Sequence, residues 1–355
     1  MRMSVRAPVR MSIAPSGRTG PAPWPVPWTM TGSPRSRAVR TAAATSLAER
    51  GSAIAAGCWS IARFQAVRAS SQPGSPGARR GGGAVLTLTA YDPGVDIDWG
   101  EGDYERTAVR LAPTAEALVA IAGVEPRHHV LDVGCGTGNA SLAAAARGAV
   151  VSAIDPSPAL VDIARERAAE AGAAVQTIVA EAGSLPFTDR AFDVVLSSFA
   201  VIFSPDAAAS LREMVRVARP EGVVALSTWL PGGAIQAAAA VLMSLVPAPP
   251  EPRPHWDDPD WIAGLLAEAG APGATIELRS IAFEDESAEA WLAEQEDHHP
   301  VWRAFRREAG AEAWDDVRRR TLAALQELNE APEAFLTTSE YAVIRSVREF
   351  GADAG

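Results

Sequence analysis

Short apolar runs alternate with segments of helical periodicity between about residues 105 and 230, and this alternation constrains the fold more than any other feature of the sequence. Runs such as VVSAI and DVVLSS hold almost no polar residue, which is typical of strands covered on both faces. Helix-forming segments such as SPALVDIARERAAEAG separate them. Strands that alternate with helices of this length form βαβ units. We therefore predict an α/β fold with a mostly parallel sheet.

The periodicity also gives approximate bounds for each element. Two polar residues, Ser157 and Asp206, stand where an N-terminal cap is expected. The expected strands are 129–134, 149–155, 175–181, 192–200, 222–230, 275–284 and 340–348. The expected helices are 105–124, 139–148, 157–172, 206–220, 233–246, 261–270, 287–308 and 311–330.

The first part of the chain differs from the rest in composition. Up to Gly82 it contains twelve arginines and one acid, Glu49, whereas the remainder contains twenty arginines and forty-two acids. A segment so rich in Pro, Ser, Gly and Arg buries too little apolar surface to offset the entropy of ordering. We expect residues 1–83 to be a disordered, low-complexity basic extension, with an organelle transit peptide or sequence upstream of the true start as alternatives. Residues 84–355 then form the folded domain, with its core at 105–230 and covering elements at 231–355.

Charge and cysteine usage exclude several classes of protein. The formal net charge of −11 opposes binding to a nucleic-acid backbone. Cys58 and Cys135 cannot form a disulfide framework, so we expect a reducing, cytoplasmic setting. No run approaches eighteen apolar residues, which argues against a membrane span. His298 and His299 have acidic neighbours but no spaced partner ligands, so we predict no metal site.

The stretch VLDVGCGTGNAS, residues 130–141, joins the first strand to its helix and is the expected ligand site. Its glycines follow a G-x-G-x-G spacing rather than the G-x-G-x-x-G of dinucleotide sites. Asp132 stands directly before them and would repel a pyrophosphate. A ligand that carries an amine and a sulfonium, with no phosphate, would be attracted instead. S-adenosylmethionine has these properties.

Acidic residues near the ends of the next two strands fit the same ligand. Asp155 ends the second strand, where a carboxylate can accept hydrogen bonds from both ribose hydroxyls. Glu181 and Ala182 end the third, where the carboxylate could accept from an adenine amino group and the Ala182 N–H could reach the ring. These positions predict a site for an adenosine cofactor.

Four segments, in this order and at these separations, resemble the class I S-adenosylmethionine-dependent methyltransferases, and in particular the small-molecule branch that includes the ubiquinone and menaquinone biosynthesis enzymes. The segments are VLDVGCGTGNAS, AIDPSPAL, AEAGSLPFTDRAFDVVLSSF and LREMVRVARPEGVVALSTW. The resemblance implies a Rossmann-like, seven-stranded sheet with an antiparallel last strand and a helical C-terminal insertion. Two positions depart from the family pattern: Glu181 replaces a commoner Asp or Asn, and Glu221 replaces a glycine.

The resemblance also assigns roles to residues. It implies that Asp132, Gly134, Gly136, Thr137 and Gly138 surround the methionine part of the cofactor and that Ser198 lies beside the cofactor after the fourth strand. Asp155 would hold the ribose, and Glu181 and Ala182 the adenine.

We therefore expect an enzyme that transfers a methyl group from S-adenosylmethionine to a small organic acceptor at C, O or N. Because the cofactor supplies an activated methyl group, the protein mainly aligns the acceptor, and the sequence singles out no catalytic residue. The segments expected to form the acceptor pocket are apolar and aromatic, so we predict an apolar or aromatic acceptor; no oligomeric state is predicted. The residues that suggest this are Trp99, Phe199, Phe203, Trp229, Met243 and Trp256.

Three alternatives remain open at this stage. One is a non-catalytic cofactor-binding protein of the same fold. Another is an NAD-linked oxidoreductase, which the glycine spacing and Asp132 disfavour. The third is a nucleic-acid methyltransferase, which the acidic composition opposes. No N/D-P-P-Y/F motif follows the fourth strand, where SSFAVIFSPD stands instead.

Overall fold

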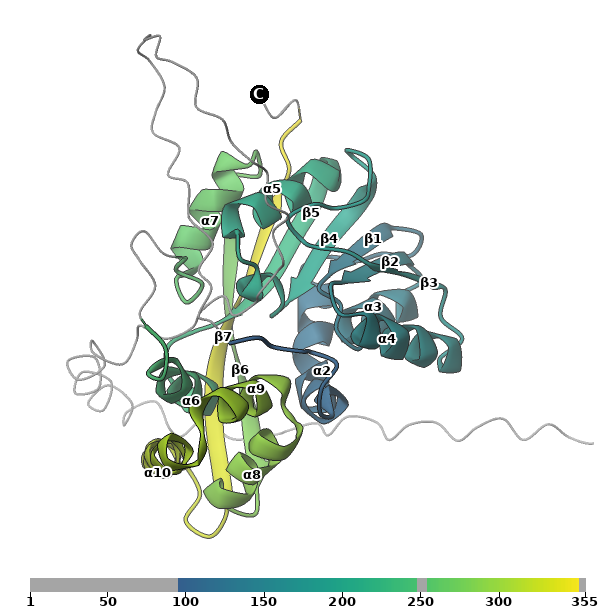
Figure 1. The fold of residues 1–355 in the computed structure, drawn as a ribbon. Coiled ribbons are helices and arrows are strands. Elements are labelled where there is room, and N and C mark those ends of the chain that lie inside the picture. Colours follow the sequence, from purple (N-terminus) through teal and green to yellow (C-terminus); the bar gives the residue numbers. More distant parts are fainter. Residues whose placement is uncertain (1–94, 248–253, 351–355) are drawn as a thin grey trace, which may run out of the picture. The chain divides into compact units, whose positions relative to one another are not determined.

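The computed structural model describes residues 95–247 and 254–350, and within these ranges the strands form one seven-stranded sheet (Figure 1). The strand order is β3-β2-β1-β4-β5-β7-β6. Strands β1 to β5 pair in parallel, whereas β7 is antiparallel to both β5 and β6. The predicted Rossmann-like sheet with an antiparallel last strand is confirmed. The strands are β1 (His129–Val133), β2 (Val150–Asp155), β3 (Val175–Val179), β4 (Phe192–Ser198), β5 (Ala218–Trp229), β6 (Thr275–Asp285) and β7 (Phe335–Val347).

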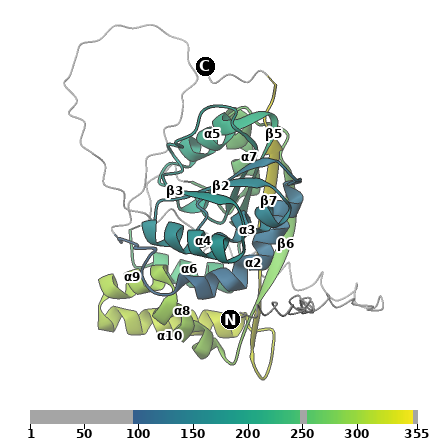
Figure 2. The same ribbon diagram turned by 90° about the vertical axis from the view of Figure 1, so that its right-hand side faces the viewer.

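Helices cover both faces of the sheet (Figure 2). One face carries α2 (Tyr104–Ile121), α3 (Asn139–Ala146) and α4 (Pro158–Glu170), and the other carries α5 (Ala207–Val217) and α7 (Pro259–Glu268). The strand order reverses between β1 and β4, which lie side by side although β2 and β3 separate them in the sequence. In open α/β sheets, a crevice opens at the carboxyl ends of the strands at such a point. The fold therefore places its candidate site after β1 and β4.

Strands β6 and β7 extend beyond the carboxyl edge of the parallel strands. β7 pairs with β5 only from Tyr341 to Val347, whereas its first half pairs with β6 alone. Four helices gather around this projecting ribbon (Figure 1). They are α6 (Gly233–Met243), α8 (Ala288–His298), α9 (Pro300–Ala309) and α10 (Ala311–Glu327). These helices are the predicted C-terminal insertion, and they stand over the carboxyl edge of the sheet.

Local sequence explains most of the element boundaries. Ser157 and Asp206 are the N-caps of α4 and α5, and each side chain accepts a hydrogen bond from a backbone N–H in the first turn, as predicted. The predicted single helix over 287–308 is wrong. It divides into α8 and α9 at His299, whose extended backbone precedes Pro300. A residue before proline is disfavoured in the helical region, so the first helix ends there.

Other boundaries shift by a few residues. β3 ends at Val179, so Glu181 and Ala182 lie in the turn after the strand rather than at its end. β7 begins at Phe335, five residues before its predicted start, because its first half pairs with β6. The predicted extension over residues 1–83 lies outside the described residues. No helix in 95–247 or 254–350 combines the length and apolar character that a membrane crossing needs.

Candidate functional site

The glycine-rich loop between β1 and α3 has a backbone that only glycine adopts easily. Gly134 has a φ of 70°, and a Cβ added to it would lie 2.3 Å from the Cβ of Ala200. Gly138 has a φ of 91° and is the residue immediately before α3. Left-handed backbone strains any residue that carries a Cβ. The loop therefore brings its own backbone close to the segment that follows β4.

Hydrogen bonds from neighbouring elements fix this loop. The Cys135 N–H donates to the Ile154 carbonyl oxygen of β2 over 2.8 Å. From α4, Arg167 Nη1 donates to the Thr137 carbonyl oxygen and to Thr137 Oγ1, each at 2.7 Å. Arg167 could not be identified from the sequence, because an arginine near the end of a helix has no distinguishing pattern. The loop is thus held in shape before any ligand arrives.

Asp132 lies at the base of the loop and is 1% exposed. Its Oδ2 accepts a hydrogen bond of 2.6 Å from Ser141 Oγ, whereas its Oδ1 has no hydrogen-bond partner among the described residues. Burial raises the pKa of Asp132 to about 6; the hydrogen bond from Ser141 opposes this shift, and the nearby charge of Asp155 adds to it. A buried carboxylate with a free oxygen favours a ligand that brings a positive charge or a hydrogen-bond donor.

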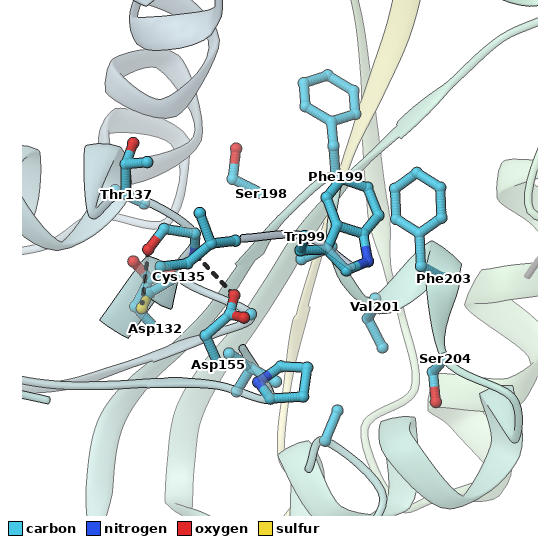
Figure 3. Close-up of a pocket in the computed structure, with 18 of the residues that line it drawn as sticks. Trp99, Asp132, Cys135, Thr137, Asp155, Ser198, Phe199, Val201, Phe203 and Ser204 are labelled. Carbon is cyan, nitrogen blue, oxygen red and sulfur yellow. Dashed lines mark hydrogen bonds between the residues drawn. The ribbon is translucent and has the colours of Figure 1, made fainter. Parts of the chain in front are cut away.

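Asp155 ends β2 and faces the same loop (Figure 3). Its Oδ2 accepts from the Gly136 N–H over 2.8 Å, and its Oδ1 accepts from the Ser157 N–H over 2.9 Å. Burial raises the pKa of this carboxyl to about 6, although both backbone hydrogen bonds lower it. A carboxylate offers about four lone-pair positions. Each oxygen of Asp155 therefore keeps capacity for one more donor.

One cavity brings together eight of the nine predicted site residues. Gly138 is the exception, since it does not line the cavity and packs against Ala164 instead. Glu181 is at the exposed mouth, where partial burial and the charge of Asp155 raise its pKa. No arginine, lysine or histidine is among the described residues that line this cavity. The predicted residues in it are Asp132, Gly134, Gly136, Thr137, Asp155, Glu181, Ala182 and Ser198.

A second cavity adjoins the first, and aromatic and aliphatic side chains dominate its lining. Five of the six residues predicted for an acceptor pocket line it. The sixth, Trp256, is wrongly predicted: it is fully buried, and Thr228 Oγ1 donates to its carbonyl oxygen. The apolar helix α6 contributes five residues to the lining, so it covers a cavity as well as packing on its neighbours. The five that line it are Trp99, Phe199, Phe203, Trp229 and Met243.

A cluster of rings lies where the two cavities meet. Trp99, Tyr104, Leu111, Phe199 and Phe203 line both cavities. The centroids of the Trp99 and Phe203 rings are 5.1 Å apart, and those of Trp99 and Tyr104 are 5.6 Å apart. Figure 3 shows Trp99, Phe199 and Phe203 gathered beside Asp155. These side chains therefore form a boundary that the two cavities share.

Phe199 has an unusual backbone for a residue of its kind. Its φ is 52°, and its ring stacks on Trp229 with centroids 4.1 Å apart. Bulky residues adopt positive φ rarely, and such strain concentrates at functional sites. The stacking holds the ring at the carboxyl end of β4, between the two cavities.

Comparisons with known proteins agree with this geometry. Residues 131–226 match the family model of a methyltransferase domain. This segment, which runs from β1 into β5, is therefore similar to methyltransferase domains. All nine predicted site residues lie within the matched segment. Most residues of the second cavity lie outside it, on α2 and after Trp229.

Several curated proteins are similar to part of this chain. An uncharacterized protein of Mycobacterium tuberculosis is 38% identical over 174 residues, which make up 48% of this chain and 64% of that protein. A malonyl-(acyl-carrier protein) O-methyltransferase of Serratia marcescens is 36% identical over 135 residues, 38% of this chain and 51% of that enzyme. The match with the mycobacterial relative thus spans just under two thirds of its length.

Two solved structures are similar to this chain at low sequence identity. The YcgJ protein of Bacillus subtilis is 19% identical with a TM-score of 0.47, and the match covers 67% of this chain and 100% of that one. A Haemonchus contortus phosphoethanolamine N-methyltransferase, solved with S-adenosylmethionine, is 19% identical with a TM-score of 0.44 and covers 67% of this chain and 53% of that one.

Proposed function

We propose that this protein transfers a methyl group from S-adenosylmethionine to a small organic acceptor. The methyltransferase domain supports the reaction class. The observation that carries the choice of cofactor is the charge of the first cavity, which is lined by three acids and by no basic residue among the described ones. A phosphate-bearing dinucleotide would meet Asp132 at the start of the loop, whereas a sulfonium and an ammonium group are attracted to it.

The residues of the first cavity fit this cofactor. The free Oδ1 of Asp132 offers an acceptor to the cationic methionine part, beside the backbone of Gly134 and Gly136. Asp155 would accept from the ribose hydroxyls with its remaining lone pairs. Glu181 and Ala182 at the mouth would contact the adenine, and Ser198 would lie beside the cofactor.

When bound, S-adenosylmethionine supplies a methyl group already activated for displacement at carbon. The protein then has to hold the acceptor in line and exclude water, which accounts for much of the rate in reactions of this kind. Trp99, Phe199 and Phe203 stand at the meeting point of the cavities and would perform both tasks.

The described site contains no obvious general base. His299 lines the second cavity, and its Nδ1 accepts a hydrogen bond from the Val301 N–H. Burial lowers the pKa of His299 to about 4, so the ring is neutral at pH 7 and carries its proton on Nε2. Neither ring nitrogen is then free to take a proton from the acceptor. The acceptor should therefore be acidic enough, or nucleophilic enough, to react with little help.

Calorimetric titration of the full chain with S-adenosylmethionine, S-adenosylhomocysteine and NADH tests the proposal. We expect one equivalent of each sulfur ligand to bind and NADH not to bind. Asp155→Ala should weaken the binding of S-adenosylmethionine at least tenfold. The control Asp162→Asn changes an exposed acid of α4 that pairs with Arg165 on the surface, and it should leave binding unchanged.

Two results would refute the assignment: no binding of S-adenosylmethionine to the wild type, or equal affinity in Asp155→Ala. Binding without formation of S-adenosylhomocysteine in any assay with phenol, quinone and carboxylic-acid acceptors would favour a cofactor-binding protein without catalytic activity.

A further inference from the structure

The apolar second cavity contains two hydrogen-bond donors that have no partner among the described residues. They are Nη1 of Arg110 and Nε1 of Trp291, both buried atoms of residues that line the cavity. Trp291 is 1% exposed. A buried donor without an acceptor is unfavourable, particularly on a charged group. Such donors in a ligand-sized cavity point to an acceptor atom that a ligand supplies.

Arg110 is held with one side of its guanidinium left free. Its Nη2 lies 3.3 Å from Asp285 Oδ2 at the end of β6, so the side chain is anchored while Nη1 is unpartnered. Asp285 Oδ1 already accepts from the Glu286 N–H. The indole of Trp291 is fixed by packing against Phe335, with ring centroids 5.9 Å apart. Both donors therefore stand on side chains that neighbouring residues position.

These donors are placed away from the proposed cofactor. Arg110 and Trp291 line the second cavity but not the first. Tyr104, one and a half turns earlier than Arg110 on α2, lines both. An oxygen bound by Arg110 and Trp291 would thus belong to the end of the acceptor remote from the methyl donor.

On the basis of the proposed function, we infer that the methyl acceptor is a small aromatic or alicyclic carboxylate. Its carboxylate would accept hydrogen bonds from Arg110 Nη1 and Trp291 Nε1 as an anchor, and its ring would lie among the apolar side chains of the cavity. A carboxylate is favoured over a neutral carbonyl because an ionised acceptor forms a stronger hydrogen bond with a guanidinium. The methylated atom would lie at the opposite end of the molecule, near Trp99 and Phe203.

Binding of two matched probes tests this inference: 2-naphthoate, and 2-naphthamide as its uncharged analogue. Both are titrated by calorimetry into the full chain saturated with S-adenosylhomocysteine. We expect the wild type to bind 2-naphthoate at least tenfold more tightly than 2-naphthamide. Arg110→Gln should abolish this preference. Trp291→Phe removes the N–H donor but keeps an aromatic ring against Phe335, and it should lower the affinity for 2-naphthoate severalfold.

Two further variants separate recognition from a structural role. Asp285→Asn removes the carboxylate charge that competes with the ligand for Arg110, so it should increase the affinity for 2-naphthoate. If the Arg110–Asp285 ion pair has only a structural role, the affinity should not increase. Arg106→Gln changes an exposed arginine of the same helix that pairs with Asp103 and Glu294, and it should have no effect.

The inference is overturned if the wild type binds neither probe, if it binds both equally, or if Arg110→Gln retains the preference. Failure of the proposed function is seen separately, as absence of S-adenosylmethionine or S-adenosylhomocysteine binding in the same preparation. In that case both probes are titrated into the protein without cofactor. A preference for 2-naphthoate that Arg110→Gln abolishes would still support a carboxylate site at Arg110, and equal binding of both probes would still exclude it.

Discussion

Replacing Asp132 by Asn should stabilise the protein in the absence of ligand, and the gain should depend on pH. The buried Asp132 has its pKa raised from 3.8 to about 6, chiefly by burial. The folded state therefore holds this proton more tightly than the unfolded chain does. The free energy of unfolding consequently decreases as pH rises through the interval between these two values, and above about pH 7 nearly the whole penalty is present.

The magnitude follows from the two pKa values. A group with these values destabilises the folded state by roughly 2 kcal/mol at pH 5 and by roughly 3 kcal/mol at pH 8. The amide of the Asp132→Asn variant would not titrate, so the difference in the free energy of unfolding between variant and wild type should grow by roughly 1 kcal/mol from pH 5 to pH 8. This change with pH does not depend on how well the new amide is hydrogen-bonded, because that contribution is the same at every pH.

Urea denaturation of both proteins at several values between pH 5 and pH 8 measures the difference. The exposed Asp162→Asn variant is the control and should stay within about 0.5 kcal/mol of wild type throughout. A difference for Asp132→Asn that is constant over this range would refute the reasoning, since it would mean that Asp132 ionises alike in the folded and unfolded states. The same variant should bind S-adenosylmethionine at least tenfold more weakly at pH 8.

Two further predictions concern backbone conformation. Gly134→Ala should lower the free energy of unfolding by about 2 to 4 kcal/mol in urea denaturation, because it adds a clash with Ala200 to the strain of positive φ. Gly123→Ala is the matched control, with the same φ of 70° but nothing within 4 Å of the new Cβ, and an equal loss in both would exclude the clash. Glu221→Gly should raise the melting temperature and add about 1 kcal/mol, because Glu221 is exposed with a φ of 63°. An unchanged or lower melting temperature would contradict that reasoning.

The lining of the first cavity could be predicted from the sequence because its residues lie in contiguous strand–turn–helix units. The loop from Gly134 to Gly138 follows β1, and Asp155 and Ser198 are the last residues of β2 and β4. Once the strands are recognised, their carboxyl ends must meet at one edge. The small errors there, such as the end of β3 at Val179, arise because pairing with a neighbour rather than local propensity ends a strand.

For the second cavity, the sequence predicted the apolar and aromatic character of the lining, and only some of the residues that form it. Its lining comes from α2, the turn after β4, α6, β6, α8 and α9, and these segments meet because β6 and β7 extend past the sheet. Local sequence carries no information on that extension, since β6 is the only strand within the described ranges that pairs with Phe335–Glu340. Trp256 has the same aromatic character as Trp229, yet the fold places it in the core. Arg110 and Trp291 were missed for the same reason: their unpartnered atoms are defined only by three-dimensional packing.

The two halves of the site differ in how they tolerate burial of polar groups. The first cavity keeps the carboxylates of Asp132 and Asp155 in an environment that raises the pKa of both, and the second keeps the donors of Arg110 and Trp291 without acceptors. Both arrangements lower the stability of the protein alone. Each would be relieved by a ligand of the kind proposed, a cationic methyl donor in the first cavity and an anionic acceptor in the second. The rings of Trp99, Tyr104 and Phe203 line both cavities. The two ligands would therefore meet among aromatic side chains, away from the carboxylates of the first cavity and the unpartnered donors of the second. Binding free energy at both ends of the site would then serve to align the transferred methyl group with its acceptor atom.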